Sequence, residues 1–232
     1  MREDREMLSR PWRRHDLLHV APDAWASVLA FRPSLADLPL LGEWADRGWP
    51  VIVRRRGEAD NRHLVPVGVP LPPAVGKRRV ALLIPPEGVL QRSRPPLLHA
   101  SASAADPNRR STIDALVAVG ARSGVEPAAF GSLLWQHLTG LAYLTPNSDL
   151  DVLWQIPANF DVHSLIRNIA QVQRDAPVHI DGEIIFPDGS AVNWRELWNA
   201  RQAADGATVL AKTMESVRLF DVTSLACVAR HA

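Results

Sequence analysis

The sequence predicts an α+β protein with two domains, in which a smaller β-rich N-terminal domain precedes a mixed sheet flanked by helices. Three observations support this fold class: β-branched runs cluster before residue 86, a Pro-, Ser- and Ala-rich stretch follows, and helical and strand-like segments then alternate. The chain has 232 residues, 47% of them hydrophobic, so it can bury a core in each domain.

The N-terminal domain, predicted over 1–85, contains three short runs that are rich in Val and Ile and broken by Pro or Gly. This composition is typical of strands joined by tight connections. Apolar residues at helical spacing also predict a helix before the first run. The predicted helix spans 35–46, and the predicted strands span 49–56, 63–71 and 78–85.

Residues 86–110 differ in composition from both flanking regions, and their content of Pro, Ser and Ala predicts a linker or exposed loop. The second domain is predicted over 111–232. Within it, Pro127 suits the first turn of a helix. The other predicted helices span 111–119, 162–174 and 193–201. The predicted strands span 149–155, 178–186 and 207–213, with a strand-to-helix turn as the alternative for 207–213.

The overall composition argues against several classes of protein. The formal net charge is +1, which gives no general affinity for nucleic acid. No apolar run reaches the roughly 20 residues that span a bilayer, and the charged first residues lack the apolar stretch of a signal peptide. The single cysteine, Cys227, excludes an internal disulfide. We therefore expect a cytoplasmic protein with no nucleic-acid or membrane partner.

Two aspartates lie two residues apart in the predicted strand 149–155. The side chains of Asp149 and Asp151 leave the same face of a strand, and apolar Leu150 lies between them. Like charges this close repel each other, so a buried pair needs a cation nearby. A bare Asp-x-Asp pair is uninformative, however. The alternative interpretation makes Asp149 a turn or cap residue and Asp151 a surface charge.

The surroundings of this pair strengthen the functional interpretation. Gly131 and Ser132 open a predicted helix, and Ser148 immediately precedes the aspartates. Glycine lets the backbone approach a phosphate, and a helix N-terminus supplies N–H donors. A second acidic pair, Asp181 and Glu183, alternates with apolar residues in the next predicted strand. In the alternative interpretation Asp181 only begins a β-turn.

Carboxylates on neighbouring strands are typical of metal-dependent phosphoryl or nucleotidyl transfer, in which divalent ions stabilise the attacking and leaving oxygens. Mg²⁺ is the expected cofactor, because it prefers hard oxygen ligands and keeps positions open for phosphate. We expect Asp149, Asp151 and Asp181 to be the catalytic metal ligands. Glu183 is the other candidate for the third carboxylate. We favour Asp181 as ligand and base, since its shorter side chain holds geometry better, with Glu183 as a supporting or ion-pair residue.

The Gly-Ser pair and the Ser-Asp-Leu-Asp run resemble the signature of the polymerase-β-type nucleotidyltransferase superfamily, although the gap between the two parts is long. Longer blocks resemble the phosphoribosyl-dephospho-CoA transferases of bacterial malonate decarboxylase, also called malonate decarboxylase holo-[acyl-carrier-protein] synthases. These blocks are RRHDLLHV (13–20), LTGLAYLTPNSDLDVLW (138–154) and DGEIIFPDGSAVNWRELW (181–198). The resemblance implies a nucleotidyltransferase-like mixed sheet in the second domain.

The resemblance also implies a reaction. Such enzymes transfer the phosphoribosyl-dephospho-CoA part of 2′-(5″-triphosphoribosyl)-3′-dephospho-CoA to a serine of the acyl-carrier-protein subunit of malonate decarboxylase, and they release pyrophosphate. Two other functions are alternatives: another metal-dependent nucleotidyltransferase, or a non-catalytic module that binds the carrier protein. The intact acidic residues argue against the module, and the N-terminal domain argues against a minimal nucleotidyltransferase.

A triphosphate donor requires cations, and arginine binds phosphate bidentately. Lys212, in the last predicted strand, is the best single candidate for a phosphate contact, and snorkelling to the surface is its alternative. Arg14 and His15 are expected to contact the donor or the carrier protein. The basic clusters 54–56 and 77–79 are either solvated strand ends or further contacts. Gly131, Ser132 and Ser148 complete the expected substrate-binding set.

Overall fold

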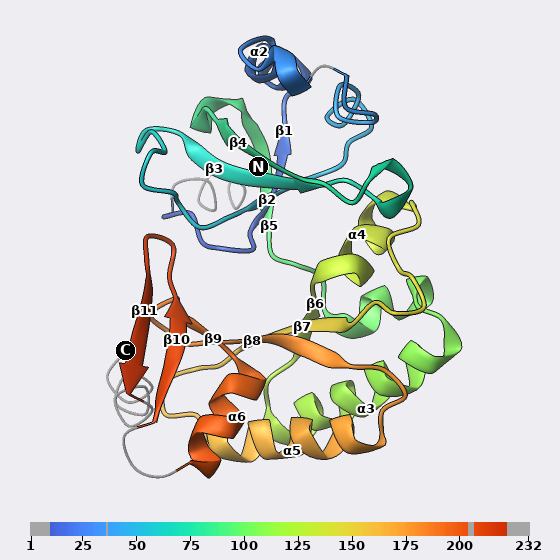
Figure 1. The fold of residues 1–232 in the computed structure, drawn as a ribbon, viewed down its shortest axis with the longest axis vertical. Helices are drawn as coiled ribbons and strands as arrows, with labels where there is room; N and C mark the ends of the chain where they lie inside the picture. The colour runs from blue at the N-terminus through green and yellow to red at the C-terminus, as the bar shows by residue number, and fades with distance from the viewer. Residues whose placement is uncertain (1–9, 36, 204–206, 222–232) are drawn as a thin grey trace. The chain divides into compact units, whose positions relative to one another are not determined.

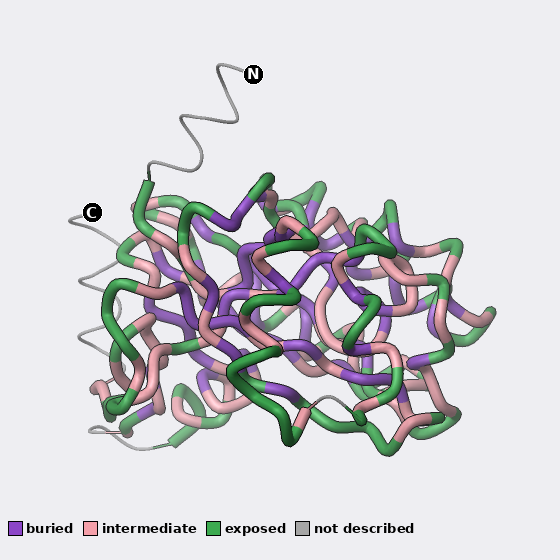
Figure 2. Tube along the Cα trace, turned by 90° about the horizontal axis from the view of Figure 1, so that it is seen from above, coloured by how far each residue is buried: buried purple, intermediate pink, exposed green. Residues whose placement is uncertain are grey.

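The computed structural model describes residues 10–35, 37–203 and 207–221 (Figure 1). The chain divides into two compact units, Met1–Pro95 and Pro96–Ala232. Within the described residues, the first unit contains a five-stranded sheet and the second a six-stranded sheet, both accompanied by helices. The predicted α+β class is confirmed. Figure 2 shows buried and exposed segments alternating along the chain.

The sheet of the first unit has the strand order β4-β3-β2-β1-β5, and all of its neighbouring strands are antiparallel. The three β-branched runs found in the sequence form β2, β3 and β4, as predicted. The elements are β1 (Leu17–Val20), α2 (Pro22–Ala30), η1 (Pro33–Leu35), β2 (Val51–Val53), β3 (Val65–Pro70), η2 (Pro73–Val75), β4 (Arg79–Ile84), η3 (Pro86–Gly88) and β5 (Val89–Ser93).

The prediction of a helix over 35–46 is wrong, because the described part of this segment forms successive turns. Pro39 lies in its middle, and proline removes a helical hydrogen bond and clashes with the preceding turn. The apolar periodicity serves packing instead. Leu41 and Trp44 are fully buried, and the Leu41 carbonyl accepts a hydrogen bond from the Trp25 indole at 2.8 Å.

Residues 86–110 do not form the predicted linker. They contain η3, β5 and the short helix η4, Leu98–Ala104, and they end in the first turn of helix α3. β5 pairs with β1 and is an edge strand of the first sheet. The boundary between the two units therefore falls between Pro95 and Pro96, after β5, and not at residue 85.

The second unit contains a mixed sheet with the order β11-β10-β9-β8-β7-β6. β7 and β8 are parallel, and the remaining neighbours are antiparallel. Figure 1 shows α3, α5 and α6 on one side of this sheet and α4 on the other. The elements after η4 are α3 (Pro107–Ser123), β6 (Pro127–Ala129), α4 (Gly131–Thr139), β7 (Leu150–Gln155), α5 (Val162–Asp175), β8 (Ile180–Ile185), β9 (Ala191–Asn193), α6 (Trp194–Gln202), β10 (Thr208–Lys212) and β11 (Val217–Asp221).

Two prolines define element boundaries that differ from the predicted ones. Pro127 lies in β6, an edge strand of the sheet, and not in a helix. Edge strands tolerate proline because one side of the strand lacks a partner. Pro107 is the first residue of α3, which is capped by Asp106 and begins four residues earlier than predicted.

No helix in the described part of the chain is both long and apolar enough to cross a membrane.

A buried ion pair fixes the chain that leads into the first sheet. The Asp16 carboxylate, fully buried, lies 2.6 Å from Nη2 of Arg92, which is also buried, and 3.1 Å from Nη1 of Arg94. Arg92 donates further hydrogen bonds to the carbonyl oxygens of Arg10 and Pro11, at 2.9 and 2.8 Å. One guanidinium on β5 thus holds both the carboxylate and the backbone that precedes β1.

We expect Asp16→Asn to destabilise the first unit by about 3–5 kcal/mol, because it leaves the Arg92 guanidinium buried without its counter-charge. Denaturant unfolding of the full chain measures the change. The matched control is Glu43→Gln, which breaks an exposed ion pair with Arg47 (3.1 Å) and should cost at most about 0.5 kcal/mol. Equal effects of the two substitutions would contradict a stabilising role for the buried pair.

Candidate active site

Four carboxylates lie along one face of the parallel strands β7 and β8. Asp151 pairs in register with Asp181, and Leu153 pairs with Glu183. Because side chains alternate along a strand, Asp151, Asp181 and Glu183 leave the same face of the sheet. Asp149 lies one residue before β7 and is exposed. The two acidic pairs predicted from the sequence are therefore brought together on adjacent strands.

Helix α4 begins directly against the Asp151 side chain. Gly131, its first residue, has φ +59°, and a Cβ there would overlap the Asp151 carboxylate. The Phe130 N–H donates to the Asp151 carbonyl oxygen at 3.1 Å, which ties the chain before the helix to β7. Ser132, the second helical residue, is partly exposed. The free N–H groups of the first turn thus lie beside the acidic face, an arrangement suited to a phosphate.

The Asp181 carboxylate is held in one orientation by two donors. Its Oδ1 accepts from the Gly182 N–H at 2.8 Å and from Nδ2 of Asn193 at 2.6 Å. Gly182 has φ +144°, and a Cβ there would overlap the backbone of Val152 on β7. Glycine at this position therefore lets the two acidic strands approach closely.

Glu183 forms an ion pair with the predicted phosphate-binding lysine. Its Oε1 lies 3.0 Å from Nζ of Lys212, on β10, and the Glu183 residue is 8% exposed. Lys212 pairs in register with Ala191, and Asn193 pairs with Glu183. These side chains continue the acidic face across β9 and β10. An ion pair is one of the two roles expected for Glu183 when Asp181 is the third carboxylate.

Asp149 lies opposite a histidine at the start of the two parallel strands. Nδ1 of His179 is 3.4 Å from Oδ1 of Asp149, and both side chains are about half exposed, at 54% and 50%. The Leu150 N–H donates to the His179 carbonyl oxygen at 2.8 Å. The backbone before β8 thus fixes where Asp149 leaves the sheet.

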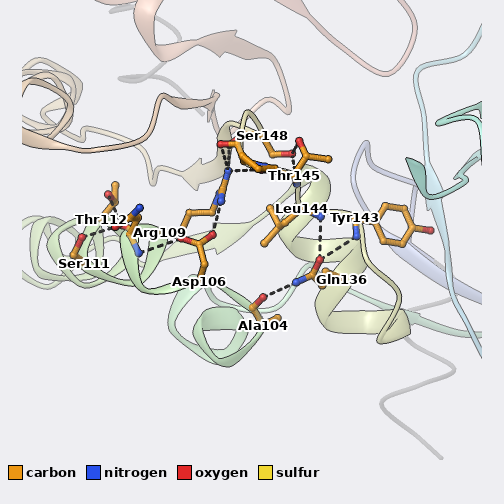
Figure 3. Close-up of polar contacts among 12 residues, drawn as sticks. Ala104, Asp106, Arg109, Ser111, Thr112, Gln136, Tyr143, Leu144, Thr145 and Ser148 are labelled. Atoms are coloured by element: carbon orange, nitrogen blue, oxygen red, sulfur yellow. Dashed lines mark hydrogen bonds and ion pairs between the residues drawn. The ribbon is translucent and has the colours of Figure 1, made fainter. Parts of the chain in front are cut away.

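A buried arginine holds the loop that leads into Asp149 (Figure 3). Arg109, on α3, is 4% exposed and forms an ion pair with Asp106, the N-cap of the same helix. Its Nη2 donates to the carbonyl oxygens of Thr145, at 2.9 Å, and of Ser148. Partial burial acts to raise the pKa of Asp106, but hydrogen bonds from Arg109 outweigh it and hold this pKa below its usual value.

Two more side chains shape the same connection. The Ser148 hydroxyl accepts a hydrogen bond from the Thr145 N–H at 2.9 Å, so it closes a turn. A contact between Ser148 and the substrate stays a prediction. Gln136, on α4, donates to the Ala104 carbonyl oxygen at 2.7 Å and accepts from the N–H groups of Tyr143 and Leu144, both at 3.0 Å (Figure 3). Side chains therefore hold the connection from α4 to β7 at residues 143–145 and 148.

Some of the residues of the first unit that are predicted to bind the donor or the carrier protein make contacts within the protein. His15 is buried with φ +73°, and its N–H donates to the Val53 carbonyl oxygen at 2.9 Å; Arg14 is partly exposed. In the cluster 54–56, Arg54 binds the Asp60 carboxylate at 2.7 and 3.1 Å and lowers its pKa. The cluster 77–79 is exposed.

The residues present suit a magnesium ion in their chemistry. Within the described parts of the chain, no three His, Cys, Asp or Glu side chains gather closely enough to hold a metal. Mg²⁺ commonly takes only one or two carboxylates, and water and substrate phosphates supply its other oxygens. Asp151 and Asp181 provide such a pair, since they lie in register on adjacent strands and Asp151 lies against the glycine at the start of α4.

Sequence reasoning missed the residues that hold this site. Asp106 and Asn193 each precede a helix, and a helix-cap search of the sequence would have found both. Their contacts with Arg109 and Asp181 join positions 3 and 12 residues apart. The bonds from Arg109 to the loop before Asp149 span more than 35 residues, and no sequence pattern indicates them.

Comparison with known proteins identifies the family. The family models of the N-terminal and C-terminal domains of phosphoribosyl-dephospho-CoA transferase MdcG match residues 13–95 and 96–223. A relative named phosphoribosyl-dephospho-CoA transferase from Bradyrhizobium diazoefficiens is 40% identical over 212 residues, 91% of either chain. Relatives of the same name from Xanthomonas campestris pv. campestris and Xanthomonas euvesicatoria pv. vesicatoria are 37% and 32% identical, each over 91% of this chain and 95% of its own.

No solved structure matches the chain significantly. The fold and the matched relatives define an enzyme of the transferase class. The chain belongs to the phosphoribosyl-dephospho-CoA transferase family, as its sequence blocks indicated.

We expect Arg109→Lys to lower the free energy of unfolding by about 1–3 kcal/mol, because one ammonium cannot replace the forked contacts to Asp106 and the loop carbonyls. Hydrogen exchange at 145–148 should rise at the same time. The control is Arg122→Lys on the exposed end of α3, which should change stability by less than about 0.5 kcal/mol. Unchanged protection of 145–148 in the Arg109 variant would contradict this role.

Proposed function

We propose that this enzyme transfers phosphoribosyl-dephospho-CoA from 2′-(5″-triphosphoribosyl)-3′-dephospho-CoA to a serine of the acyl-carrier-protein subunit of malonate decarboxylase. The observation that carries the proposal is the register of Asp151 with Asp181 beside the N-terminus of α4. Membership of the phosphoribosyl-dephospho-CoA transferase family supports the choice of donor. The serine acceptor and the carrier protein follow from the sequence resemblance.

In the proposed reaction the serine oxygen forms a bond to the α-phosphorus of the donor, and the bond from that phosphorus to the pyrophosphate oxygen breaks. The serine proton goes to a carboxylate, for which we propose Asp181. Because both hydrogen bonds to Asp181 go to Oδ1, we assign the proton to Oδ2. A carboxylate within reach of the hydroxyl is the geometric requirement for this step.

We propose that Asp151 and Asp181 hold Mg²⁺ as the in-register pair, and that Asp149 joins them as a ligand when the ion and the donor bind. When bound, this ion would neutralise charge on the donor phosphates and on the leaving pyrophosphate. The first-turn N–H groups of α4 and the Ser132 hydroxyl would bind phosphate oxygens on the same face. Lys212 would contact the departing pyrophosphate from β10, with Glu183 orienting its ammonium.

The first unit supplies further candidate binding residues. A donor with a dephospho-CoA tail and a protein acceptor needs more surface than a mononucleotide. We propose that Arg14, His15 and the basic clusters 54–56 and 77–79 contribute to binding of the donor or carrier protein. Arg14 lies beside His15, whose left-handed backbone is uncommon for a non-glycine residue and accompanies functional sites in many proteins.

The direct test is incubation of the purified full chain with Mg²⁺, the carrier subunit and either the triphosphoribosyl donor or ATP. Mass spectrometry should detect phosphoribosyl-dephospho-CoA on the carrier with the first donor alone, and chelation of Mg²⁺ should abolish it. Asp149→Asn and Asp151→Asn should each lower the rate at least about 100-fold while retaining the fold. Transfer from ATP alone would favour another nucleotidyltransferase, and near-normal transfer by either variant would reject the metal assignment.

A second comparison separates the two candidates for the third carboxylate. Asp181→Asn should lower the transfer rate at saturating donor by at least about 100-fold, because it removes both a metal ligand and the proton acceptor. Glu183→Gln should act mainly on donor or pyrophosphate binding through Lys212, so kcat should fall less than about tenfold. If the Glu183 variant is inactive and the Asp181 variant keeps most of its rate, the roles are reversed.

A further inference from the structure

Asn193 uses both ends of its side-chain amide. It is the last residue of β9 and the N-cap of α6. Its Oδ1 accepts hydrogen bonds from the N–H groups of Arg195 and Glu196, at 2.9 and 3.2 Å. Its Nδ2 donates to Oδ1 of Asp181 at 2.6 Å. One side chain therefore joins the start of a helix to a carboxylate of the candidate active site.

The helix determines which way the amide points. An N-cap must present an acceptor to the N–H groups of the first turn, so the Asn193 oxygen faces α6. The NH₂ group is then left for Asp181, where only a donor suits an ionised carboxylate. Ser, Thr and Asp cap helices about as well as Asn does. None of them also supplies a nitrogen donor, so asparagine is the one residue of this group that caps α6 and donates an N–H to Asp181.

The first turn of α6, which directly follows Asn193, is held by hydrogen bonds to three other elements or their flanking residues. Nη2 of Arg195 donates to the Ile180 carbonyl oxygen, immediately before Asp181, and to Oε1 of Gln173 on α5, both at 2.7 Å. Oε1 of Glu196 accepts from the Leu210 N–H on β10 at 2.6 Å. The first turn of α6 is thus anchored to β8, α5 and β10, and it cannot shift without breaking these bonds.

We propose that Asn193 is a positioning residue that orients the Asp181 carboxylate for metal binding and proton transfer. The inference rests on the proposed function of that carboxylate. With Asn193 and the Gly182 N–H both on Oδ1, rotation of the carboxyl group is restrained, and Oδ2 is left for the metal or the incoming hydroxyl. A donor to a ligating carboxylate commonly changes metal affinity or activity about 10–100-fold.

Two substitutions keep the helix cap and remove the donor. Asn193→Ser should weaken Mn²⁺ binding, measured by calorimetry on the full chain without donor, by about 10–100-fold. It should raise the Mg²⁺ concentration required for half-maximal transfer by a similar factor. Asn193→Asp also removes the donor, but its negative charge adds attraction for the cation, so it should weaken Mn²⁺ binding less than Asn193→Ser does. Thermal unfolding should change little in Asn193→Ser, because Ser is a good N-cap.

Asp161→Ser is the matched control, because it changes the N-cap of α5, whose side chain accepts from the Ser164 N–H at 3.1 Å. This variant should bind Mn²⁺ and use Mg²⁺ as the wild type does. A purely structural role of Asn193 would lower the unfolding temperature and leave Mn²⁺ affinity unchanged. That result, or wild-type Mn²⁺ affinity in Asn193→Ser, would overturn the inference.

The two proposals fail in different ways. If the wild-type enzyme transfers the group and Asn193→Ser matches it in both Mn²⁺ affinity and Mg²⁺ dependence, the positioning role is rejected and the proposed function stands. If the wild type does not modify the carrier, the proposed function is rejected. Loss of Mn²⁺ affinity in Asn193→Ser would then still support the orientation of Asp181 by Asn193.

Discussion

The parallel pairing of β7 with β8 is the constraint on which the candidate site depends. Side chains alternate between the two faces of a strand, so a slip of one residue would turn every acid toward the helix-covered face. The apolar residues next to the acids along both strands oppose such a slip, because their side chains are fully buried on the opposite face. These residues are Leu150, Val152, Ile180 and Ile184. The close approach at Gly182 adds a steric constraint, since only a residue without Cβ can lie against the Val152 backbone there. The packing of the apolar face of β7 and β8 therefore determines that the acidic side chains lie together on the opposite face.

Helix N-termini hold the acidic residues in place. At the start of α3, Asp106 and Arg109 form an ion pair that fixes the loop before Asp149. At the start of α6, Asn193 caps the helix and binds Asp181. Both caps belong to helices on the covered side of the sheet, as Figure 1 shows. The stability of these helices and the geometry of the carboxylates are consequently linked through the same hydrogen bonds.

Much of the second unit could be predicted from the sequence, because its signals are local. Alternating apolar residues predicted β7 and β8, and helical periodicity predicted α5 and α6. The failures have two causes: Pro39 interrupts the apolar pattern of the predicted helix 35–46, and Pro127, interpreted as the start of a helix, lies in the edge strand β6. Composition alone suggested a linker at 86–110, yet pairing with β1 makes part of it a strand. Likewise, the acids could be predicted from their spacing, whereas Arg109 reaches its carbonyl partners only after the chain has folded.

The contact between Gly131 and Asp151 makes these two positions a single steric unit. A methyl group on residue 131 and the carboxylate of residue 151 would occupy the same space, although 19 intervening residues separate them in the sequence. Any side chain at 131 would therefore require the acid to change its rotamer or the helix to retreat from the sheet. The distance between the N-terminus of α4 and the acidic strand β7 is thus set by the absence of a side chain at residue 131.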